Sequence, residues 1–354
     1  MISACIITRN EADALKGCIE ALKRYDVEIV VVDTGSIDHT AMVTDGYDEI
    51  KVFNYEWCDD FSAARNFAAS KASNDIIFMV DTDELVEDID IESIERKMKI
   101  NPYLAGKVMR TSAAVRGGEP IFVTDYPGRI YNRKYCHFDG KVFEKIVPVP
   151  GVANIDRFDT FVAKAGLMHC IFTGDGAKSL GQKAVRNLDI FGRAGIKKND
   201  SSWALYMQGK ALYYAGKYSE AADAFERAMG GEHDSSLDYA VELIAGYGHS
   251  LLLCGRHEKA MELESLWPNL GRSSDFAFVM GLIYKANALN DAAISAFERA
   301  LTLPAGLMNG VNSFLPNYMI GVIHEEQGFL DDAKIDYETC GDYEKAVKAL
   351  ERLG

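Results

Sequence analysis

The sequence predicts an α/β domain with a mostly parallel sheet, followed by an all-α solenoid of helical repeats. The chain has 354 residues, which is enough for two separate cores. Short aliphatic runs alternate with amphipathic helical segments at the start, as in strands joined by helical crossovers. Small and aromatic residues then recur at intervals of 33 to 40 residues, as in a helical repeat with a period of about 34 that carries loop insertions. We expect one domain at 1–177, a linker helix within 178–200 and a repeat domain at 201–354.

Four strands are expected in the first part of the chain. Residues 3–8, 28–33 and 50–55 give the first three, and the apolar run that starts at residue 76 gives the fourth. The second is almost wholly aliphatic and the fourth is a short apolar run, as expected of parallel strands that are covered on both faces. The helix after the first strand carries one apolar stripe at helical spacing, formed by Leu15, Cys18, Ile19 and Leu22.

The fourth strand ends in three carboxylates within four residues, Asp81, Asp83 and Glu84. Buried carboxylates that lack partners cost several kcal/mol, so this cluster must face water or be neutralised. A divalent cation that bridges to a diphosphate would neutralise it, because Mg²⁺ and Mn²⁺ prefer oxygen ligands and share them with phosphates. The alternative is a polar turn after a core strand.

Polar side chains also follow the other strands. In an open α/β sheet, ligands bind beyond the carboxyl ends of the strands, so these side chains predict a nucleotide site. No GxGxxG pattern follows the first strand, which disfavours a dinucleotide. The converging residues are Thr8, Arg9 and Glu11 from the first strand, Asp33 from the second, and Asp81 with Asp83 from the fourth.

Composition excludes several classes of protein. A net charge of -15 argues against general nucleic-acid binding, which needs clustered Lys and Arg. No apolar run reaches the roughly 18 residues that suggest a membrane span, and the first residues lack the features of a signal peptide. The seven cysteines form no CxxC pair, so we expect reduced thiols in a cytoplasmic protein.

The second half carries a repeat from residue 201 onward. The small and aromatic positions match those of a tetratricopeptide unit, and the frame recurs about four times before an amphipathic closing helix at 342–353. Stacked units of this kind bury a continuous core and leave a concave surface for binding. The leading glycines of the repeats are Gly209, Gly248, Gly281 and Gly321.

Four motifs in the first domain together resemble a known family. They read ITRNEADALKGCI at 7–19, EIVVVDTGSIDHT at 28–40, WCDDFSAARN at 57–66 and IIFMVDTDE at 76–84. In this order they resemble family 2 glycosyltransferases, whose GT-A fold is Rossmann-like with a mostly parallel sheet. The resemblance is greatest to the branch with C-terminal tetratricopeptide repeats, which includes bacterial peptide S-glycosyltransferases of the sublancin type and flagellin glycosyltransferases.

The resemblance implies a UDP-sugar donor and Mn²⁺ or Mg²⁺ as the cofactor. Thr8, Arg9 and Glu11 would then line the uridine pocket, and Asp33 would accept a hydrogen bond from the uracil. Arg65 would lie against the base or the diphosphate. Asp81 would hold the ribose or share the metal, and Asp83 would bind the metal. The alternatives are a turn acid for Asp33 and a surface ion pair for Arg65.

After a helix at 91–100, turn signals indicate antiparallel strands at 106–115, 121–125, 128–131 and 141–147. The resembled family places its general base here, which selects Glu144, although Phe143 stands where the family usually has His. Asp125 and Asp139 are reserve candidates, and a surface glutamate is the alternative for Glu144. His169 matches a family histidine and is a candidate metal ligand, with a core histidine as the alternative.

These features predict an inverting, metal-dependent glycosyltransferase. Its acceptor would be a protein or peptide, modified on Ser or Thr oxygen or on Cys sulfur, and the repeats would recruit that polypeptide or form a homodimer. One alternative is a glycosyltransferase that acts on a surface polysaccharide or a lipid-linked glycan. The other is a scaffold whose repeats bind proteins and whose first domain is catalytically silent.

Overall fold

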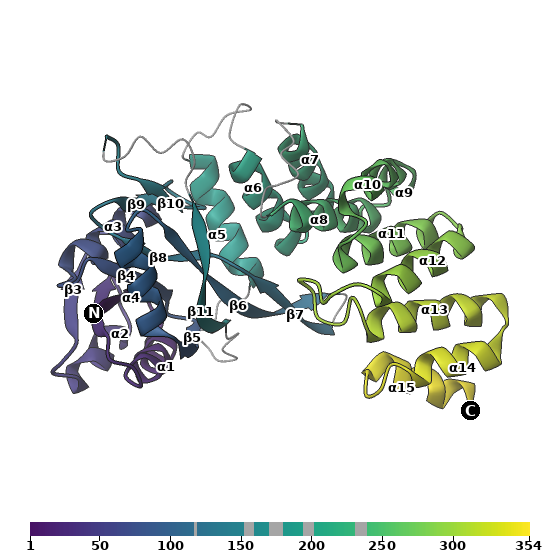
Figure 1. The fold of residues 1–354 in the computed structure, drawn as a ribbon, viewed down its shortest axis with the longest axis horizontal. Helices are drawn as coiled ribbons and strands as arrows, with labels where there is room; N and C mark the ends of the chain where they lie inside the picture. The colour runs from purple at the N-terminus through teal and green to yellow at the C-terminus, as the bar shows by residue number, and fades with distance from the viewer. Residues whose placement is uncertain (117–118, 152–158, 170–179, 194–201, 231–238) are drawn as a thin grey trace. The chain divides into compact units, whose positions relative to one another are not determined.

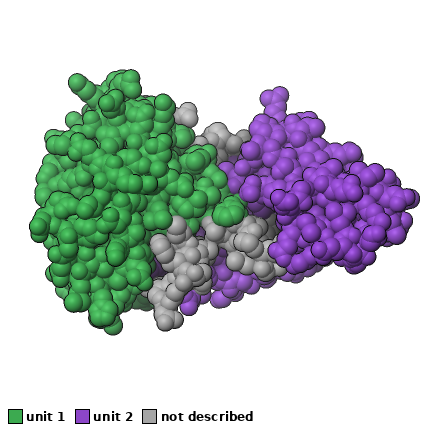
Figure 2. All heavy atoms as spheres, turned by 90° about the horizontal axis from the view of Figure 1, so that it is seen from below, with its two compact units in different colours: residues 1–179, 189–196 green, residues 180–188, 197–354 purple. Residues whose placement is uncertain are grey.

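The computed structural model describes residues 1–116, 119–151, 159–169, 180–193, 202–230 and 239–354. The chain forms two compact units (Figure 2). The first comprises Met1–Ser179 with Asp189–Ile196, and the second comprises Leu180–Leu188 with Lys197–Gly354. Helix α5 (Leu180–Arg193) falls within the segment that was expected to link two domains. No helix in the described ranges is long and apolar enough to cross a membrane.

The first unit is built on a mixed sheet whose first half is parallel (Figure 1). The order in the sheet is β3-β2-β1-β4-β8-β6-β11-β5, and β7 pairs with β6. Strands β1 to β4 pair in parallel, β8 runs antiparallel to both β4 and β6, and β11 is parallel to β6 but antiparallel to β5. The strands are β1 (Ile2–Thr8), β2 (Glu28–Asp33), β3 (Lys51–Asn54), β4 (Ile76–Asp81), β5 (Glu84–Ile89), β6 (Ala105–Arg116), β7 (Glu119–Asp125), β8 (Gly128–Asn132) and β11 (Thr160–His169), with a separate hairpin of β9 (Cys136–Asp139) and β10 (Lys145–Pro148).

Helices cover both faces of the sheet. Helix α1 (Ala12–Leu22) buries the predicted stripe, and with α4 (Ile91–Ile100) it shares a core with Ile2, Ala4 and Ile6 of β1. The alternate residue Cys5 points to the other face, where Ala68 and Ala69 of α3 (Phe61–Lys71) pack. This alternation is the period of two expected of a strand that is covered on both sides. The predicted α/β class is confirmed.

Three strands were not anticipated, β5, β9 and β11, and one expected strand is shorter than predicted. Strand β5 keeps Glu84, Val86 and Ile89 on its buried side, and the alternation breaks where the pairing with β11 shifts register. Because a bulge interrupts the period of two, the sequence pattern does not reveal the strand. The expected strand at 141–147 begins only at Lys145, because Phe143 adopts a positive φ of 59° that ends regular pairing.

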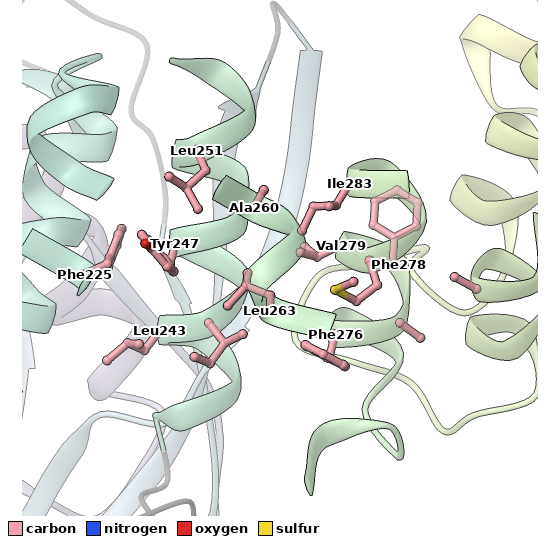
Figure 3. Packing of buried hydrophobic residues seen from close by; sticks show 14 of the residues in the cluster. Phe225, Leu243, Tyr247, Leu251, Ala260, Leu263, Phe276, Phe278, Val279 and Ile283 are labelled. Carbon is pink, nitrogen blue, oxygen red and sulfur yellow. The ribbon is translucent and has the colours of Figure 1, made fainter. Parts of the chain in front are cut away.

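The second unit is a series of packed helices (Figure 1), which confirms the predicted all-α array. Its core runs continuously from α6 to α13, and the residues drawn in Figure 3 form part of it. A smaller cluster joins α14 to α15. The elements are α6 (Ser202–Tyr214), α7 (Tyr218–Met229), α8 (Ala240–Leu253), α9 (His257–Ala260), η2 (Met261–Leu266), α10 (Trp267–Leu270), α11 (Ser274–Ala286), α12 (Asn290–Leu301), α13 (Phe314–Gln327), α14 (Leu330–Glu338) and α15 (Glu344–Leu353).

The repeat glycines allow paired helices to approach closely. A Cβ added at Gly209 would lie 2.6 Å from the ring of Phe225, and one at Gly321 would lie 2.7 Å from the ring of Tyr337. Both rings are almost fully buried and belong to the second helix of the same repeat. Glycine at these positions is therefore a packing requirement of each repeat.

The second repeat departs from this plan. Where one continuous helix would follow α8, the chain forms the short α9, the 3-10 turn η2 and the short α10. Pro268 lies in the first turn of α10, and a proline has no N–H to continue a helix that enters from η2. The indole Nε1 of Trp267 donates to the Tyr284 hydroxyl at 3.0 Å, and that hydroxyl donates to Glu264 at 3.0 Å. These bonds join the broken segment to α11.

Replacing Gly321 by Ala should destabilise the array, because the new methyl group would overlap the buried ring of Tyr337. We expect a loss of about 1–3 kcal/mol in the free energy of unfolding, as for other overpacked cores. The control is Gly192→Ala in α5, where nothing lies within 4 Å of the added Cβ. That change should be neutral or slightly stabilising, because Ala favours a helix over Gly. Urea unfolding followed by circular dichroism measures both, and equal effects would contradict the packing role.

Candidate active site

The loops after β1 and β2 are held together by hydrogen bonds. The backbone N–H of Asn10 donates to Ser36 Oγ at 2.9 Å, and the Asn10 Oδ1 accepts from the N–H of Ile37 at 2.8 Å. The N–H of Glu11 donates to Thr40 Oγ1 at 2.9 Å. Three bonds between two loops fix the edge of the sheet at which a nucleotide was predicted to bind.

The residues predicted to line the uridine pocket meet at this edge. Thr8 and Asp33 are direct partners in the register of β1 and β2, and both are buried. The Asp33 Oδ1 accepts from the N–H groups of Gly35 at 2.8 Å and Ser36 at 2.7 Å, so this oxygen shapes the turn. The Asp33 Oδ2 makes no hydrogen bond to the rest of the described chain, and Thr8 Oγ1 is buried without a partner there. Arg9 is exposed.

The first loop also contacts the acidic turn after β4. The hydroxyl of Thr82, which lies between Asp81 and Asp83, donates to the Glu11 carboxylate. Thr82 is buried, so the contact lies inside the unit. Glu11, predicted to line the uridine pocket, therefore links that loop to the acidic turn.

Arg65 lies inside the unit. Its Nη2 is 2.8 Å from Asp81 Oδ1, and its Nε is 2.7 Å from Glu144 Oε1. The residue is 5% exposed, and its Nη1 is buried without a hydrogen-bond partner in the described structure. The guanidinium also lies 5.4 Å from the ring centroid of Phe138. Arg65 is thus a buried bridge between two predicted site carboxylates, a role that the sequence did not indicate.

The bridge continues through two more arginines. Arg129 Nη2 lies 2.6 Å from both Asp81 Oδ2 and Glu84 Oε1. Arg110 Nη1 is 3.0 Å from the same Glu84 oxygen, and its Nε and Nη2 donate to the two oxygens of Asp125 at 2.8 and 2.6 Å. These contacts make one chain of alternating charge, which we call the ion chain: Glu144, Arg65, Asp81, Arg129, Glu84, Arg110 and Asp125.

The ion chain keeps Asp81 and Arg65 charged. Burial alone would raise the pKa of Asp81, but Arg129 and Arg65 hold that pKa well below its usual range. Burial would lower the pKa of Arg65, but Asp81 and Glu144 raise it above its usual value. Opposite charges at short range outweigh desolvation for both groups. Asp81 therefore stays ionised, with each oxygen held by an arginine.

Asp83 pairs with His169. The Asp83 Oδ2 lies 2.9 Å from His169 Nε2, and the other ring nitrogen lies 3.2 Å from Ser112 Oγ. The sheet brings these residues together, because His169 of β11 is in register with Glu84 of β5 on one side and with Ser112 of β6 on the other. Burial and the nearby Arg110 lower the pKa of His169, which favours the neutral imidazole that a metal requires.

The Asp83 and His169 pair fits a divalent cation. Adjacent ligands of an octahedral ion, each about 2.1 Å from the metal, are about 3.0 Å apart, and the two atoms are separated by 2.9 Å. In the described residues no set of three His, Cys, Asp or Glu side chains is placed to hold a metal. A site with few protein ligands suits an ion whose remaining positions are filled by phosphate oxygens and water. Asp81, predicted to share the metal or hold the ribose, has both oxygens on arginines.

The AARN motif braces α3 against the β9–β10 hairpin. The N–H of Phe61 donates to the carbonyl of Lys141 at 2.8 Å. Asn66 both donates to the carbonyl of Phe138 at 2.8 Å and accepts from its N–H at 2.9 Å. With the contact from Arg65, these bonds set Glu144 at the end of the ion chain.

The three candidate bases differ in their surroundings. Asp125 has both oxygens on Arg110. Glu144 accepts from Arg65 through Oε1, and its Oε2 has no hydrogen-bond partner among the described residues. Asp139 is exposed at the end of β9. The sequence did not indicate Arg110 or Ser112, which are two positions apart on one face of β6. Only the pairing of β6 with β11 shows that Ser112 meets His169 and that Arg110 lies near enough to act on its charge.

Comparisons with known proteins agree with this architecture. Residues 3–140 match the model of the glycosyl transferase family 2, and residues 275–305 match that of the tetratricopeptide repeat. The first unit therefore contains a family 2 glycosyltransferase domain of GT-A-like fold, and the second unit contains tetratricopeptide repeats. The resemblance drawn from the motifs is confirmed.

Individual relatives match parts of the chain. The SPbeta prophage-derived glycosyltransferase SunS of Bacillus subtilis is 25% identical over 236 residues, covering 64% of this chain and 53% of that protein. The lipopolysaccharide core biosynthesis glycosyltransferase LpsC of Rhizobium meliloti is 32% identical over 43% of this chain and 59% of its own. A TPR repeat-containing protein of Synechococcus elongatus is 43% identical over 23% of this chain and 20% of its own. The chain thus spans between 20% and 59% of the length of these relatives.

Replacing Arg65 by Ala should strongly destabilise the first unit, because the buried guanidinium bridges two partly buried carboxylates that would lose their partner. We expect a loss of about 3–5 kcal/mol at pH 7. The control is Arg193→Ala, which also removes a guanidinium with two carboxylate partners, Asp59 and Asp189, but from an exposed site. That change should cost less than about 1 kcal/mol.

The loss in the free energy of unfolding should also depend on pH for Arg65→Ala more than for Arg193→Ala. The folded-state pKa of Asp81 is lowered, so its stabilising contribution is complete above its unfolded pKa of about 3.9 and is lost as the pH falls below that value. Urea unfolding at pH 7 and at lower pH measures this. Equal losses for the two arginines, or a difference that does not change with pH, would contradict the buried bridge.

Proposed function

We propose that the protein is an inverting glycosyltransferase that transfers a sugar from a UDP-sugar to an acceptor. The observation that supports this best is the Asp83 and His169 pair. It lies next to Thr82, whose hydroxyl contacts Glu11 in the loop that follows β1. Two residues suited to bind a metal therefore lie next to the loop that is suited to bind a uridine. A UDP-sugar needs both, because the metal would bind its diphosphate and the loop its uridine. The match to the glycosyl transferase family 2 model supports the same reaction.

The donor would be held from both ends. Asp33 Oδ2 would accept from the uracil imide, while Thr8, Arg9 and Glu11 would surround the uridine. Asp83 and His169 would hold Mn²⁺ or Mg²⁺, which supplies positive charge to the diphosphate that departs. Asp81, fixed by Arg65 and Arg129, would present a permanent negative charge near the ribose or the cation.

Glu144 would act as the general base. Its Oε2 is available to take the acceptor proton, while Arg65 orients the carboxylate through Oε1. The acceptor oxygen or sulfur would bond to the anomeric carbon as the bond from that carbon to the UDP oxygen breaks. The proton would pass to Glu144, and a single displacement would invert the anomeric centre.

The acceptor would be a protein or a peptide that the repeats recruit. Tetratricopeptide arrays bind polypeptides on extended surfaces, and the second unit has a core of its own. We also propose that the enzyme acts in the cytoplasm, since the six cysteines in the described part of the chain are free thiols. A second candidate acceptor is a glycan, which the likeness to the lipopolysaccharide core glycosyltransferase favours.

Release of UDP from a panel of UDP-sugars, with and without Mn²⁺, tests the reaction. Peptide and oligosaccharide acceptors are supplied separately, and intact mass shows which one gains a sugar. Wild-type protein should release UDP only with a divalent cation, and Asp83→Ala should abolish this release because the cation loses its carboxylate ligand. Asp75→Ala is the matched control, because Asp75 precedes the opposite end of β4 and pairs with Lys134 at the surface. Metal-independent turnover, or an active Asp83 variant, would remove the metal assignment.

Glu144→Gln should reduce transfer by about 10²- to 10⁴-fold, because an amide cannot take the acceptor proton. Donor binding should be little changed. The matched variants Asp125→Asn and Asp139→Asn remove the other two candidate carboxylates. If Asp139→Asn removes transfer and Glu144→Gln does not, the base is Asp139 and our assignment is wrong.

A further inference from the structure

We propose that Glu84 is a positioning residue that sets the direction of Asp83 without touching either substrate. This inference rests on the proposed function, since it concerns the same pair of Asp83 and His169. Glu84 is fully buried and lies at the start of β5, immediately after Asp83. It is the member of the ion chain that joins Arg129 to Arg110, yet the family motifs by themselves give it no role.

Glu84 closes the acidic turn. Its Oε2 accepts from the backbone N–H of Asp81 at 3.1 Å, so the first and last residues of the turn are tied together around Thr82 and Asp83. Its Oε1 accepts from Arg129 at 2.6 Å and Arg110 at 3.0 Å. Both carboxylate oxygens are therefore engaged, and the turn is fixed to strands β8 and β6.

The register of the sheet explains how Glu84 orients Asp83 toward His169. Glu84 is in register with His169 on the neighbouring strand, so the residue that closes the turn lies beside the residue that Asp83 must meet. Arg129 also holds Asp81 on the other side of the turn. Movement of Glu84 would shift both ends of the turn, and Asp83 would no longer be held 2.9 Å from His169.

The charge of Glu84 is as necessary as its shape. A buried carboxylate is tolerated only with partners that compensate its desolvation, and two guanidinium groups supply this compensation. A glutamine at this position has one oxygen and one NH₂ group. It can accept from the arginines or from the Asp81 N–H, but not from both sides, so one contact must be lost.

Glu84→Gln tests the proposal in the full-length protein. Binding of Mn²⁺ in the presence of UDP is followed by the electron paramagnetic resonance signal of free Mn²⁺, and UDP release is measured alongside. We expect Mn²⁺ binding to weaken by about 10- to 100-fold, the loss typical of residues that orient metal ligands. The Mn²⁺ concentration that gives half-maximal UDP release should rise by a similar factor.

Two further variants keep the result decisive. Arg110→Gln removes only the partly exposed outer partner of Glu84, and it should weaken Mn²⁺ binding in the same direction by a smaller factor. If Glu84→Gln fails to fold, Mn²⁺ binding by Arg110→Gln tests whether Glu84 positions Asp83. Glu28→Gln removes a partly buried carboxylate at the amino end of β2, paired with Lys51 at 2.6 Å, and should leave Mn²⁺ binding unchanged.

A double-mutant cycle separates positioning from a general loss of stability. If Glu84 and Arg129 act on Asp83 as one unit, Glu84→Gln with Arg129→Gln should weaken Mn²⁺ binding no more than the worse single change. Folded Glu84→Gln protein with wild-type Mn²⁺ binding would overturn the positioning role. If Glu84→Gln does not fold, wild-type binding by Arg110→Gln would overturn it too. Wild-type protein that releases no UDP from any donor would instead overturn the proposed function.

Discussion

Charge neutralisation inside the first sheet is the constraint on which the site depends. Four carboxylates come together there, one of them fully buried and three partly buried, and removing them from water without partners would cost several kcal/mol each. Three arginines from α3, β6 and β8 meet them, so the carboxylates join these elements in addition to the apolar cores. The consequence is a rigid base beneath the acidic turn, from which Asp83 faces His169.

The second unit is held together by a different means. Its repeats pack glycine against buried aromatic rings, as Gly209 does against Phe225, and they need no buried ion pair at those contacts. The second repeat gives up its continuous helix near Pro268 and is joined to its neighbour by Trp267 and Tyr284. Each unit has a core of its own, and the residues of the candidate site all belong to the first unit.

Local pattern was enough to predict part of this architecture. The first four strands and the buried stripe of α1 follow from short apolar runs and helical spacing, which depend only on neighbouring residues. Strand β5 was missed because a register shift interrupts its alternation. The partners of Arg65 were missed for another reason: Glu144 lies 79 positions away, and no local signal predicts that contact. Residues that the motifs predicted to contact a ligand, such as Arg65, can therefore instead bind one another inside the domain.

The central claim is that Asp83 and His169 hold the cation that binds the diphosphate of the donor. A crystal structure of the protein with UDP and Mn²⁺ tests it directly, because the anomalous signal of manganese locates the ion. The account predicts the manganese between Asp83 Oδ2 and His169 Nε2, each about 2.1–2.2 Å away, with Asp33 against the uracil. Manganese bound to other residues, or UDP bound away from the loops after β1 and β2, would contradict it.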